Sequence, residues 1–309
     1  MRALRSRRRS SRDVRVLGAV AWALCLGSGC HRPAGRLTYE TLQSAAEQRE
    51  LRYGVYLPPA WDRTTPLPLV VLLHGRGDDE TSADRTSLTS ALDAGIRAGT
   101  IPPFVMATPE GEVGFWANWY DGSYRWKDWV LDEVIPDVAA RYPVVETQAG
   151  LHLVGVSMGG GGGLQMWLGE PSRFASASIL SAPIMNEADT RRLLRRFTSD
   201  RVVERVFGPP GSSAGHDPYV VLTQPEHLQG SRLLFGAATH DIPVMLASNR
   251  SFHRHLSEMS LPHRYLEFPG RHGWKAWSDA IPYALCVQLQ ETCSIPAPAS
   301  WQVAVVERN

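Results

Sequence analysis

Short apolar runs alternate with stretches of helical spacing along most of the chain. The run Leu69–Leu73 is continuously apolar, as expected of a strand buried on both faces, whereas 51–57 alternates before two prolines like an outer antiparallel strand. Further strands are predicted at 104–107, 151–156, 175–180, 232–238 and, as the last one, 264–268. The spacing of apolar residues predicts helices at 82–98, 126–142, 244–259 and 273–290. This alternation predicts an α/β fold with a mostly parallel central sheet and helices on both faces.

Two features interrupt the pattern. Pro136 lies inside the helix predicted over 126–142 and should kink or break it. Residues 184–230 hold helical pieces but no buried strand, which predicts a cap or lid inserted into the domain. We therefore predict one α/β domain over 36–293, followed by a loose tail over 294–309.

The sequence Gly155-Val156-Ser157-Met158-Gly159 joins a predicted buried strand to an apolar helix. A G-x-S-x-G in a strand–turn–helix context is typical of a nucleophile elbow, in which a sharp turn holds the serine hydroxyl at the top of a sheet. The alternative is a glycine-rich loop that happens to contain a serine. A phosphate-binding loop fits less well, because no Gly-Lys-Ser/Thr closes the run. Ser157 is therefore the candidate nucleophile.

A serine hydroxyl is a weak nucleophile near neutral pH, so it needs a base, and that base needs an orienting acid. In folds with this elbow, the acid and the histidine follow later strands, in the order Ser…Asp/Glu…His. Asp241 comes just after the strand predicted at 232–238, and His272 comes just after the strand at 264–268. Both should lie at the same edge of the sheet as the serine. We predict His272 as the base and Asp241 as the residue that orients it.

Other polar residues are weaker candidates. His240 is a neighbour that could support Asp241, while Asp217 in the insertion and Asp279 on the last helix are expected to be solvated. No His, Cys, Asp and Glu cluster has tight metal-ligand spacing, so neither a metal site nor a cofactor is expected.

The tetrahedral intermediate of acyl transfer needs backbone N–H donors. One should be the N–H of Met158, the residue after the nucleophile, and the other should come from the loop after Leu69–Leu73. His74-Gly75-Arg76-Gly77 occupies that loop. We predict the Arg76 N–H as the second donor, with Gly77 as the alternative.

Four residues are candidates for contact with substrate. Trp116, Trp119 and Tyr120 lie in an aromatic loop predicted over 114–124, and could stack on a sugar or an aromatic group. Packing beneath the loop is the alternative for these rings. His74, the first residue of the predicted oxyanion loop, completes the set.

The net charge of +1 conceals an asymmetry. Residues 1–29 hold seven arginines and one aspartate, a local charge of +6, so the remainder carries −5. The body of the protein thus has no basic surplus with which to bind nucleic acid.

The arginine-rich head 1–15, the apolar segment 16–26 and the small residues before Cys30 are typical of an export signal over residues 1–29. Leu26-Gly27-Ser28-Gly29-Cys30 is similar to a lipoprotein box, which predicts a lipid on Cys30 that attaches the protein to a membrane; simple cleavage nearby is the alternative. We therefore expect an exported protein that is periplasmic, lipid-anchored or secreted.

Cysteine usage is consistent with export. With Cys25 in the signal and Cys30 at its end, Cys286 and Cys293 remain as an even pair close in sequence. In an oxidising compartment they could form a disulfide at the end of the last helix, and two free buried thiols are the alternative.

Taken together, these motifs resemble the esterase D-like branch of the α/β-hydrolases, which includes S-formylglutathione hydrolases, feruloyl and acetyl-xylan esterases, enterochelin esterases and mycolyltransferases. The matching stretches lie in order along the chain: Leu72-Leu73-His74-Gly75, Ile101-Pro102-Pro103-Phe104, Pro109-Glu110-Gly111, Trp119-Tyr120, Glu133-Val134-Ile135-Pro136, the elbow with Gly160, and His272-Gly273-Trp274. The resemblance implies a triad of Ser157, Asp241 and His272, donors at Arg76 and Met158, and cleavage of short or aromatic esters and thioesters without a cofactor. Gly161-Gly162-Gly163 and the insertion 184–230 depart from this pattern.

We therefore predict an exported serine carboxylesterase that acts on small-molecule esters. An acyltransferase with the same triad, in which an alcohol intercepts the acyl-enzyme, is one alternative. A catalytically silent hydrolase fold used for binding is another, although all three triad residues are present.

Overall fold

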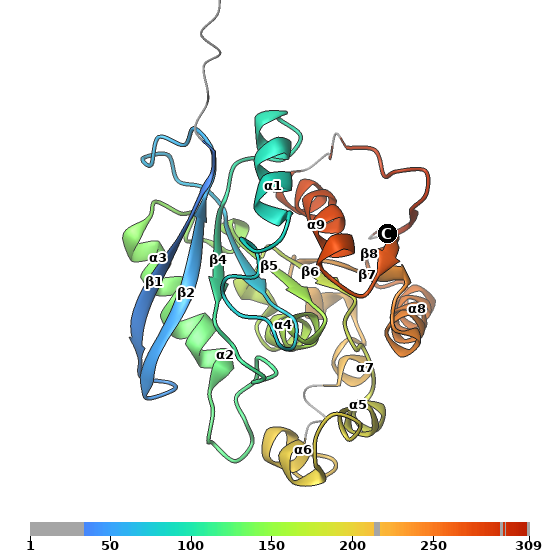
Figure 1. Ribbon diagram of the computed structural model, residues 1–309. Coiled ribbons are helices and arrows are strands. Elements are labelled where there is room, and N and C mark those ends of the chain that lie inside the picture. Colours follow the sequence, from blue (N-terminus) through green and yellow to red (C-terminus); the bar gives the residue numbers. More distant parts are fainter. Residues whose placement is uncertain (1–33, 213–216, 291–292, 294, 308–309) are drawn as a thin grey trace, which may run out of the picture. The chain divides into compact units, whose positions relative to one another are not determined.

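The computed structural model describes residues 34–212, 217–290, 293 and 295–307. The predicted export signal, residues 1–29, and Cys30 lie outside the described residues. Within that described part, nine strands form one sheet in the order β1-β2-β4-β3-β5-β6-β7-β8-β9 (Figure 1). The strands are β1 (Arg36–Ser44), β2 (Arg49–Leu57), β3 (Leu69–Leu73), β4 (Val105–Pro109), β5 (Leu151–Val156), β6 (Ser176–Leu180), β7 (Arg232–His240), β8 (His263–Arg271) and β9 (Gln302–Val306).

Six neighbouring strands in the middle of the sheet, in the order β4-β3-β5-β6-β7-β8, run parallel to one another. This confirms the predicted, mostly parallel sheet. All residues of β3, β4, β5 and β6 are buried, because helices cover both faces of the sheet. The carboxyl ends of these strands therefore meet at one rim, which is where loops can present polar side chains.

Two separate apolar cores occupy the two faces of the sheet. On one face, α1 (Leu88–Arg97) and α9 (Trp274–Leu289) pack against residues such as Val70 and Leu72. On the other, α4 (Met158–Gly169), α8 (Pro243–Glu258) and the 126–141 helical region pack against the alternate residues of the same strands (Figure 1). Alternation along each buried strand thus divides the core in two.

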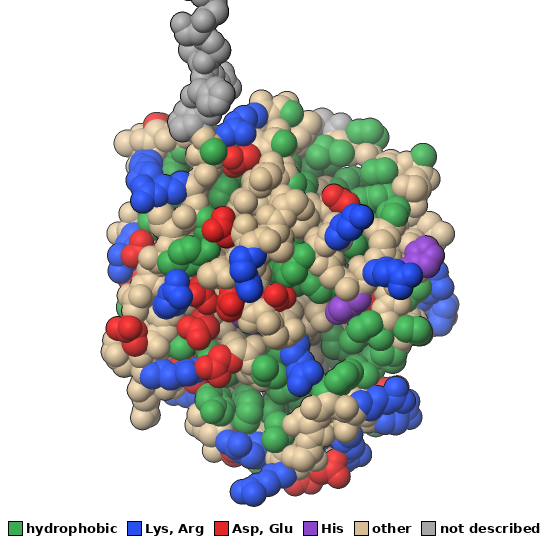
Figure 2. Space-filling view, viewed as in Figure 1, with side chains coloured by type: hydrophobic (Ala, Val, Ile, Leu, Met, Phe, Trp, Pro, Cys, Tyr) green, Lys and Arg blue, Asp and Glu red, His purple; other side chains and the backbone are tan. Residues whose placement is uncertain are grey.

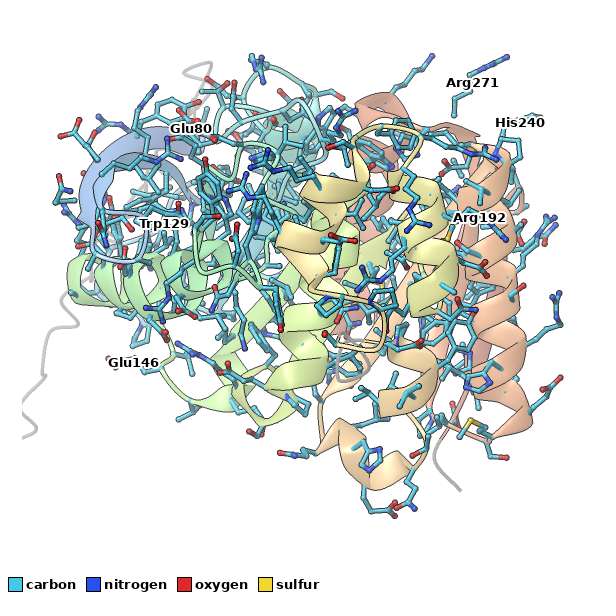
Figure 3. The ribbon with its side chains drawn as sticks, turned by 90° about the horizontal axis from the view of Figure 1, so that it is seen from below. Glu80, Trp129, Glu146, Arg192, His240 and Arg271 are labelled. Atoms are coloured by element: carbon cyan, nitrogen blue, oxygen red, sulfur yellow. A yellow bond between two sulfur atoms is a disulfide. The ribbon has the colours of Figure 1, made fainter. Side chains whose placement is uncertain are left out.

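The helix predicted over 126–142 is not broken at the proline, because the backbone stays helical over 126–141 and changes only its form. It consists of α2 (Trp126–Asp128), a π-helical stretch (Trp129–Val134) and α3 (Ile135–Arg141), with Pro136 in the first turn of α3. Proline has no N–H to donate, and the π-helical stretch directly before it rearranges the helical hydrogen bonds at that place. The buried ring of Trp129 is labelled in Figure 3.

Both ends of the sheet differ from the prediction. Strand β1 was not predicted. It pairs antiparallel with β2, so β1 and not β2 is the edge strand of the sheet. The loose tail predicted over 294–309 is wrong for residues 302–306, because they form β9, which pairs antiparallel with β8; 264–268 therefore does not belong to the last strand. Apolar residues on these outer strands are only partly buried, which weakens the sequence signal that identifies them.

The insertion 184–230 forms a cap with no strand among its described residues. Its helices are α5 (Glu187–Leu194), α6 (Asp200–Phe207) and α7 (Pro218–Val221), followed by a 3₁₀ turn (Pro225–Leu228). Asn186 and Ser199 cap the first two helices by accepting hydrogen bonds from backbone N–H groups. The cap lies at the bottom of Figure 1, where α5, α6 and α7 are grouped together.

Near the chain end, the structure pairs Cys286 at the end of α9 with Cys293 in a disulfide. Among the described residues, the helices are too short or too polar for any of them to cross a bilayer.

Candidate active site

Ser157 occupies the sharp turn between β5 and α4. Its backbone has φ of 54° and ψ of −117°, a conformation that non-glycine residues rarely adopt. The flanking glycines permit this turn: a Cβ on Gly155 would lie 2.2 Å from the carbonyl oxygen of Gly159, and one on Gly159 would lie 2.1 Å from that of Leu73. The elbow therefore depends on close backbone approach on both sides of the serine.

Three strand ends bring the predicted triad together. The Oγ of Ser157 lies 2.8 Å from Nε2 of His272, and Nδ1 of His272 lies 2.6 Å from Oδ1 of Asp241. Ser157 follows β5, Asp241 follows β7, and His272 follows β8. With Nδ1–H donated to the carboxylate, Nε2 is free to accept the hydroxyl proton.

The carboxylate of Asp241 is buried and fully hydrogen-bonded. Oδ1 also accepts the N–H of Ile242 at 2.7 Å, while Oδ2 accepts the hydroxyl of Ser181 at 2.5 Å and the N–H of Ala238 at 3.2 Å. Burial raises the pKa of Asp241, but the hydrogen bonds from His272 and Ser181 outweigh it and leave the pKa below its ordinary value. Asp241 is therefore ionised at neutral pH and able to stabilise an imidazolium.

Sequence reasoning missed two residues that support this carboxylate. Ser181 directly follows β6, also with a left-handed φ of 54°, and its hydroxyl accepts a hydrogen bond from the indole N–H of Trp277 at 3.0 Å. The Trp277 ring packs edge-on against His272, with centroids 5.0 Å apart. The available signal is that Ser181 directly follows a buried strand, as the triad residues do, although serines are common at such places.

The loop after β3 passes directly beside the nucleophile. A Cβ placed on Gly75 would lie 3.3 Å from the Cβ of Ser157, and Arg76 lines the same cleft as Ser157 and His272. Met158 is the first residue of α4, so its N–H has no acceptor within the helix. The two predicted oxyanion donors thus belong to the segments that border Ser157.

A cleft of about 640 Å³ opens over Ser157, between the rim of the sheet and the cap. Most of its lining is apolar, and the cap and its flanks contribute Pro183, Met185, Leu193, Leu194, Phe197, Val206 and Phe207. At its mouth lie three exposed large side chains, Tyr120, Phe197 and Ile242. Figure 2 shows hydrophobic side chains gathered where the cap meets the rest of the domain. An apolar cleft with a reactive serine at one wall suits an ester with a hydrophobic part.

Two of the four predicted substrate contacts line this cleft, and two do not. Trp116 and Tyr120 line it, although Trp116 is otherwise fully buried and donates its indole N–H to the His74 carbonyl at 3.2 Å. His74 is only 2% exposed and packs edge-on against Trp116, so it lies behind the wall of the cleft. Trp119 packs against Tyr124, beneath the guanidinium of Arg205, and does not line this cleft, so its contact with substrate stays a prediction.

The rival polar residues lie outside the triad, although Asp217 lines the same cleft. His240 is exposed and contacts Thr239; Figure 3 shows it with Arg271, its partner in the β7–β8 register, near the margin of the molecule. Asp217 is buried, which corrects the expectation of a solvated residue, because it caps α7 and also accepts the N–H of Glu187. Asp279 is exposed on α9. Among the described residues, no group of three or more potential ligands could hold a metal ion.

The triad residues lie in a part of the chain that matches a protein family. Residues 44–286 match the model of the esterase family described as "Putative esterase", a span that includes all three triad positions. Esterase Rv1288 of Mycobacterium tuberculosis is 26% identical over 260 residues, which cover 77% of this chain and 56% of that protein. This chain therefore spans little more than half the length of that relative.

Solved structures share the fold. FphF of Staphylococcus aureus, a fluorophosphonate-binding serine hydrolase, has a TM-score of 0.71 and 25% identity over 84% of this chain and 100% of that chain. The S-formylglutathione hydrolase FrmB of the same organism has a TM-score of 0.68 and 24% identity over the same shares. A ferulic acid esterase has a TM-score of 0.70 and 18% identity, covering 83% of this chain and 98% of that chain. The resemblance to esterase D-like hydrolases and the α/β-hydrolase fold are thereby confirmed.

Proposed function

Because the chain belongs to the esterase family, we propose that this protein is a serine carboxylesterase that hydrolyses carboxylic esters through an acyl-enzyme. The observation that carries the proposal is the continuous hydrogen-bonded path from the Ser157 hydroxyl through His272 to the buried carboxylate of Asp241. Such a path gives a serine the base and the oriented tautomer that nucleophilic attack requires.

In the first half of the reaction, Oγ of Ser157 attacks the ester carbonyl while Nε2 of His272 takes its proton. The resulting imidazolium is stabilised by Asp241. As the tetrahedral intermediate collapses, the C–O bond to the alcohol breaks and His272 returns the proton to the departing alkoxide. The acyl group remains on Ser157.

In the second half, a water molecule replaces the alcohol. His272 removes a proton from this water as its oxygen attacks the acyl carbonyl, and then gives the proton to Oγ of Ser157 as the acid leaves. The backbone N–H groups of Met158 and Arg76 would stabilise the oxyanion in both halves. Their position in the segments that border Ser157 supports this role.

We also propose that the protein is exported, with residues 1–29 as its signal and a lipid on Cys30. The arginine-rich head and the apolar segment before the cysteine support this proposal. A bonded Cys286–Cys293 pair would suit an oxidising compartment. Intact mass of the protein purified from a membrane fraction, with and without Cys30→Ser, tests the lipid directly.

The mechanism is tested by Ser157→Ala against p-nitrophenyl acetate and butyrate. Loss of the nucleophile should reduce kcat by about 10³-fold or more, because the remaining cleft can only bind the ester. Circular dichroism of the variant controls for folding. Unchanged hydrolysis by a correctly folded variant contradicts the proposal.

A further inference from the structure

The glycines at the start of α4 face different surroundings. A Cβ on Gly162 would lie 2.3 Å from the Cβ of Trp116 and 2.6 Å from the carbonyl oxygen of Phe115, so close packing requires a glycine there. A Cβ on Gly161 would meet only Pro183, at 3.5 Å, and one on Gly163 would meet apolar side chains at 3.4 to 3.5 Å. These are ordinary van der Waals distances, so packing does not require glycine at position 161 or 163.

Gly161 and Gly163 differ in the surroundings that a side chain at each position would enter. Gly161 is partly exposed and lines the cleft, whereas Gly163 is buried against Leu153, Ile179 and Leu73 in the core. The Gly161 N–H donates to the carbonyl oxygen of Ser157 at 3.0 Å, which places Gly161 one helical turn from the nucleophile. A side chain at position 161 would therefore project into the cleft close to the reacting carbonyl.

The surroundings of Gly161 are apolar. Pro183 lies beside it, and Met185, Leu193 and Phe197 continue the same cleft toward the cap. The cleft volume of about 640 Å³ lies within the roughly 300–1,000 Å³ that small-molecule pockets occupy. There is thus room near Ser157 for a hydrocarbon chain, provided that no side chain stands at position 161.

The two halves of an ester must lie on different sides of Ser157. The alcohol oxygen has to approach Nε2 of His272 to receive its proton. The ring of His272 packs against Trp277 of α9, on the face of the sheet opposite to α4. The acyl chain, which stays on the serine, would then extend toward α4 and the cap.

We propose that Gly161 determines acyl-chain specificity: the missing side chain opens the first turn of α4 to a medium-length acyl group, such as octanoyl. This inference rests on the proposed esterase function. Each methylene buried along the cleft should raise kcat/KM by roughly fourfold until the space is filled.

The test compares Gly161→Leu and Gly161→Ala with Gly163→Ala, using p-nitrophenyl acetate and octanoate. Gly163→Ala is the matched control, because it makes the same glycine replacement in the same helix on the side away from the cleft. Gly161→Leu should lower the ratio of octanoate to acetate kcat/KM by about tenfold or more, and Gly161→Ala by less. Gly163→Ala should keep the wild-type ratio.

A second series, octyl acetate against ethyl acetate, tests the assignment to the acyl side. Gly161→Leu should leave the octyl-to-ethyl ratio within about twofold, because the alcohol lies on the His272 side. An unchanged octanoate-to-acetate ratio in folded Gly161→Leu, or a loss confined to octyl acetate, overturns the inference. Absence of any hydrolysis that depends on Ser157 instead overturns the proposed function itself.

Discussion

The rim of the sheet and the cap are held in place in different ways. At the rim, the residues that directly follow β5, β6, β7 and β8 meet within hydrogen-bonding distance, and each of these strands is paired on both sides. The cap has no strand among its described residues, and its three α-helices contain eight, eight and four residues. Helices this short are marginal without tertiary contacts.

The cap is organised by side chains that bind backbone groups. The buried guanidinium of Arg191 donates hydrogen bonds to the carbonyl oxygens of Phe207, Gly208 and Pro209, at 2.9 to 3.1 Å. Toward the domain body, the N–H of Tyr120 donates to Val206, and Arg205 forms an ion pair with Asp121. The comparison suggests a division of roles: the sheet fixes the chemistry, and the cap shapes the space for the substrate.

The largest expected effect lies at the rim. Asp241→Asn keeps the shape of the side chain but removes the charge that orients His272, so kcat should fall by about 10³- to 10⁴-fold. Steady-state kinetics with p-nitrophenyl acetate measures the loss. Leu194→Ala, at the cap wall of the cleft, is the contrasting variant and should lower kcat for the same ester far less. Equal losses of kcat in the two variants would contradict the division of roles between the rim and the cap.

The next largest effect concerns the contact between α4 and the aromatic loop. Gly162→Ala places a methyl group against Trp116 and a backbone oxygen, so the free energy of unfolding should fall by about 3 kcal/mol. Gly163→Ala should instead raise it by up to about 1 kcal/mol, through helix propensity. Urea denaturation measures both. A stabilised Gly162→Ala variant would show that close packing does not explain this glycine.

Acid should weaken the sheet through His152, a buried residue of β5 that contacts Ser176. Burial, together with the charge of Arg232, lowers the pKa of His152 to about 4, from an ordinary value of 6.5. Between these pH values the unfolded chain binds a proton that the folded chain does not, so stability falls as the pH falls.

For His152 alone, this difference amounts to about 2 kcal/mol between pH 7 and pH 5. Urea denaturation at both pH values, in the wild type and in His152→Gln, measures how much of the loss of stability is due to His152. The decline should be smaller in His152→Gln and unchanged in His240→Gln, which alters an exposed histidine. An equal decline in the wild type and His152→Gln would assign the acid sensitivity to other groups.

The smallest effect is expected at the boundary of the cap. The ion pair between Arg205 and Asp121 is about one-third exposed on both sides, so Arg205→Gln should change the free energy of unfolding by less than about 1 kcal/mol. Urea denaturation measures this change as well. A loss of several kcal/mol would mean that the boundary of the cap stabilises the whole domain.

The difference between the rim and the cap also explains which site residues could be predicted from the sequence. Ser157, Asp241 and His272 each follow a short apolar strand, and parallel strands must bring their carboxyl ends to one rim; their meeting could be predicted without coordinates. Ser181 satisfies the same rule, but a serine after a strand is too common to be noticed alone. Strands β1 and β9 were missed because their side chains are only partly buried.

Residues around the cleft were harder to assign. Trp119 and Trp116 lie three positions apart in one loop, yet only Trp116 lines the cleft. Loop conformation decides such a difference, and neither periodicity nor composition encodes it. The roles of Gly161, Gly162 and Gly163 likewise became distinct only once their neighbours were known.

The central claim is that His272 activates Ser157 as the nucleophile. Reaction of the folded protein with a fluorophosphonate, followed by peptide mass spectrometry, tests it most directly. We expect a single adduct on Ser157, none in Ser157→Ala, and labelling slowed by about 10³-fold or more in His272→Ala. An adduct on another serine, or labelling of Ser157 at an unchanged rate without His272, would contradict the claim.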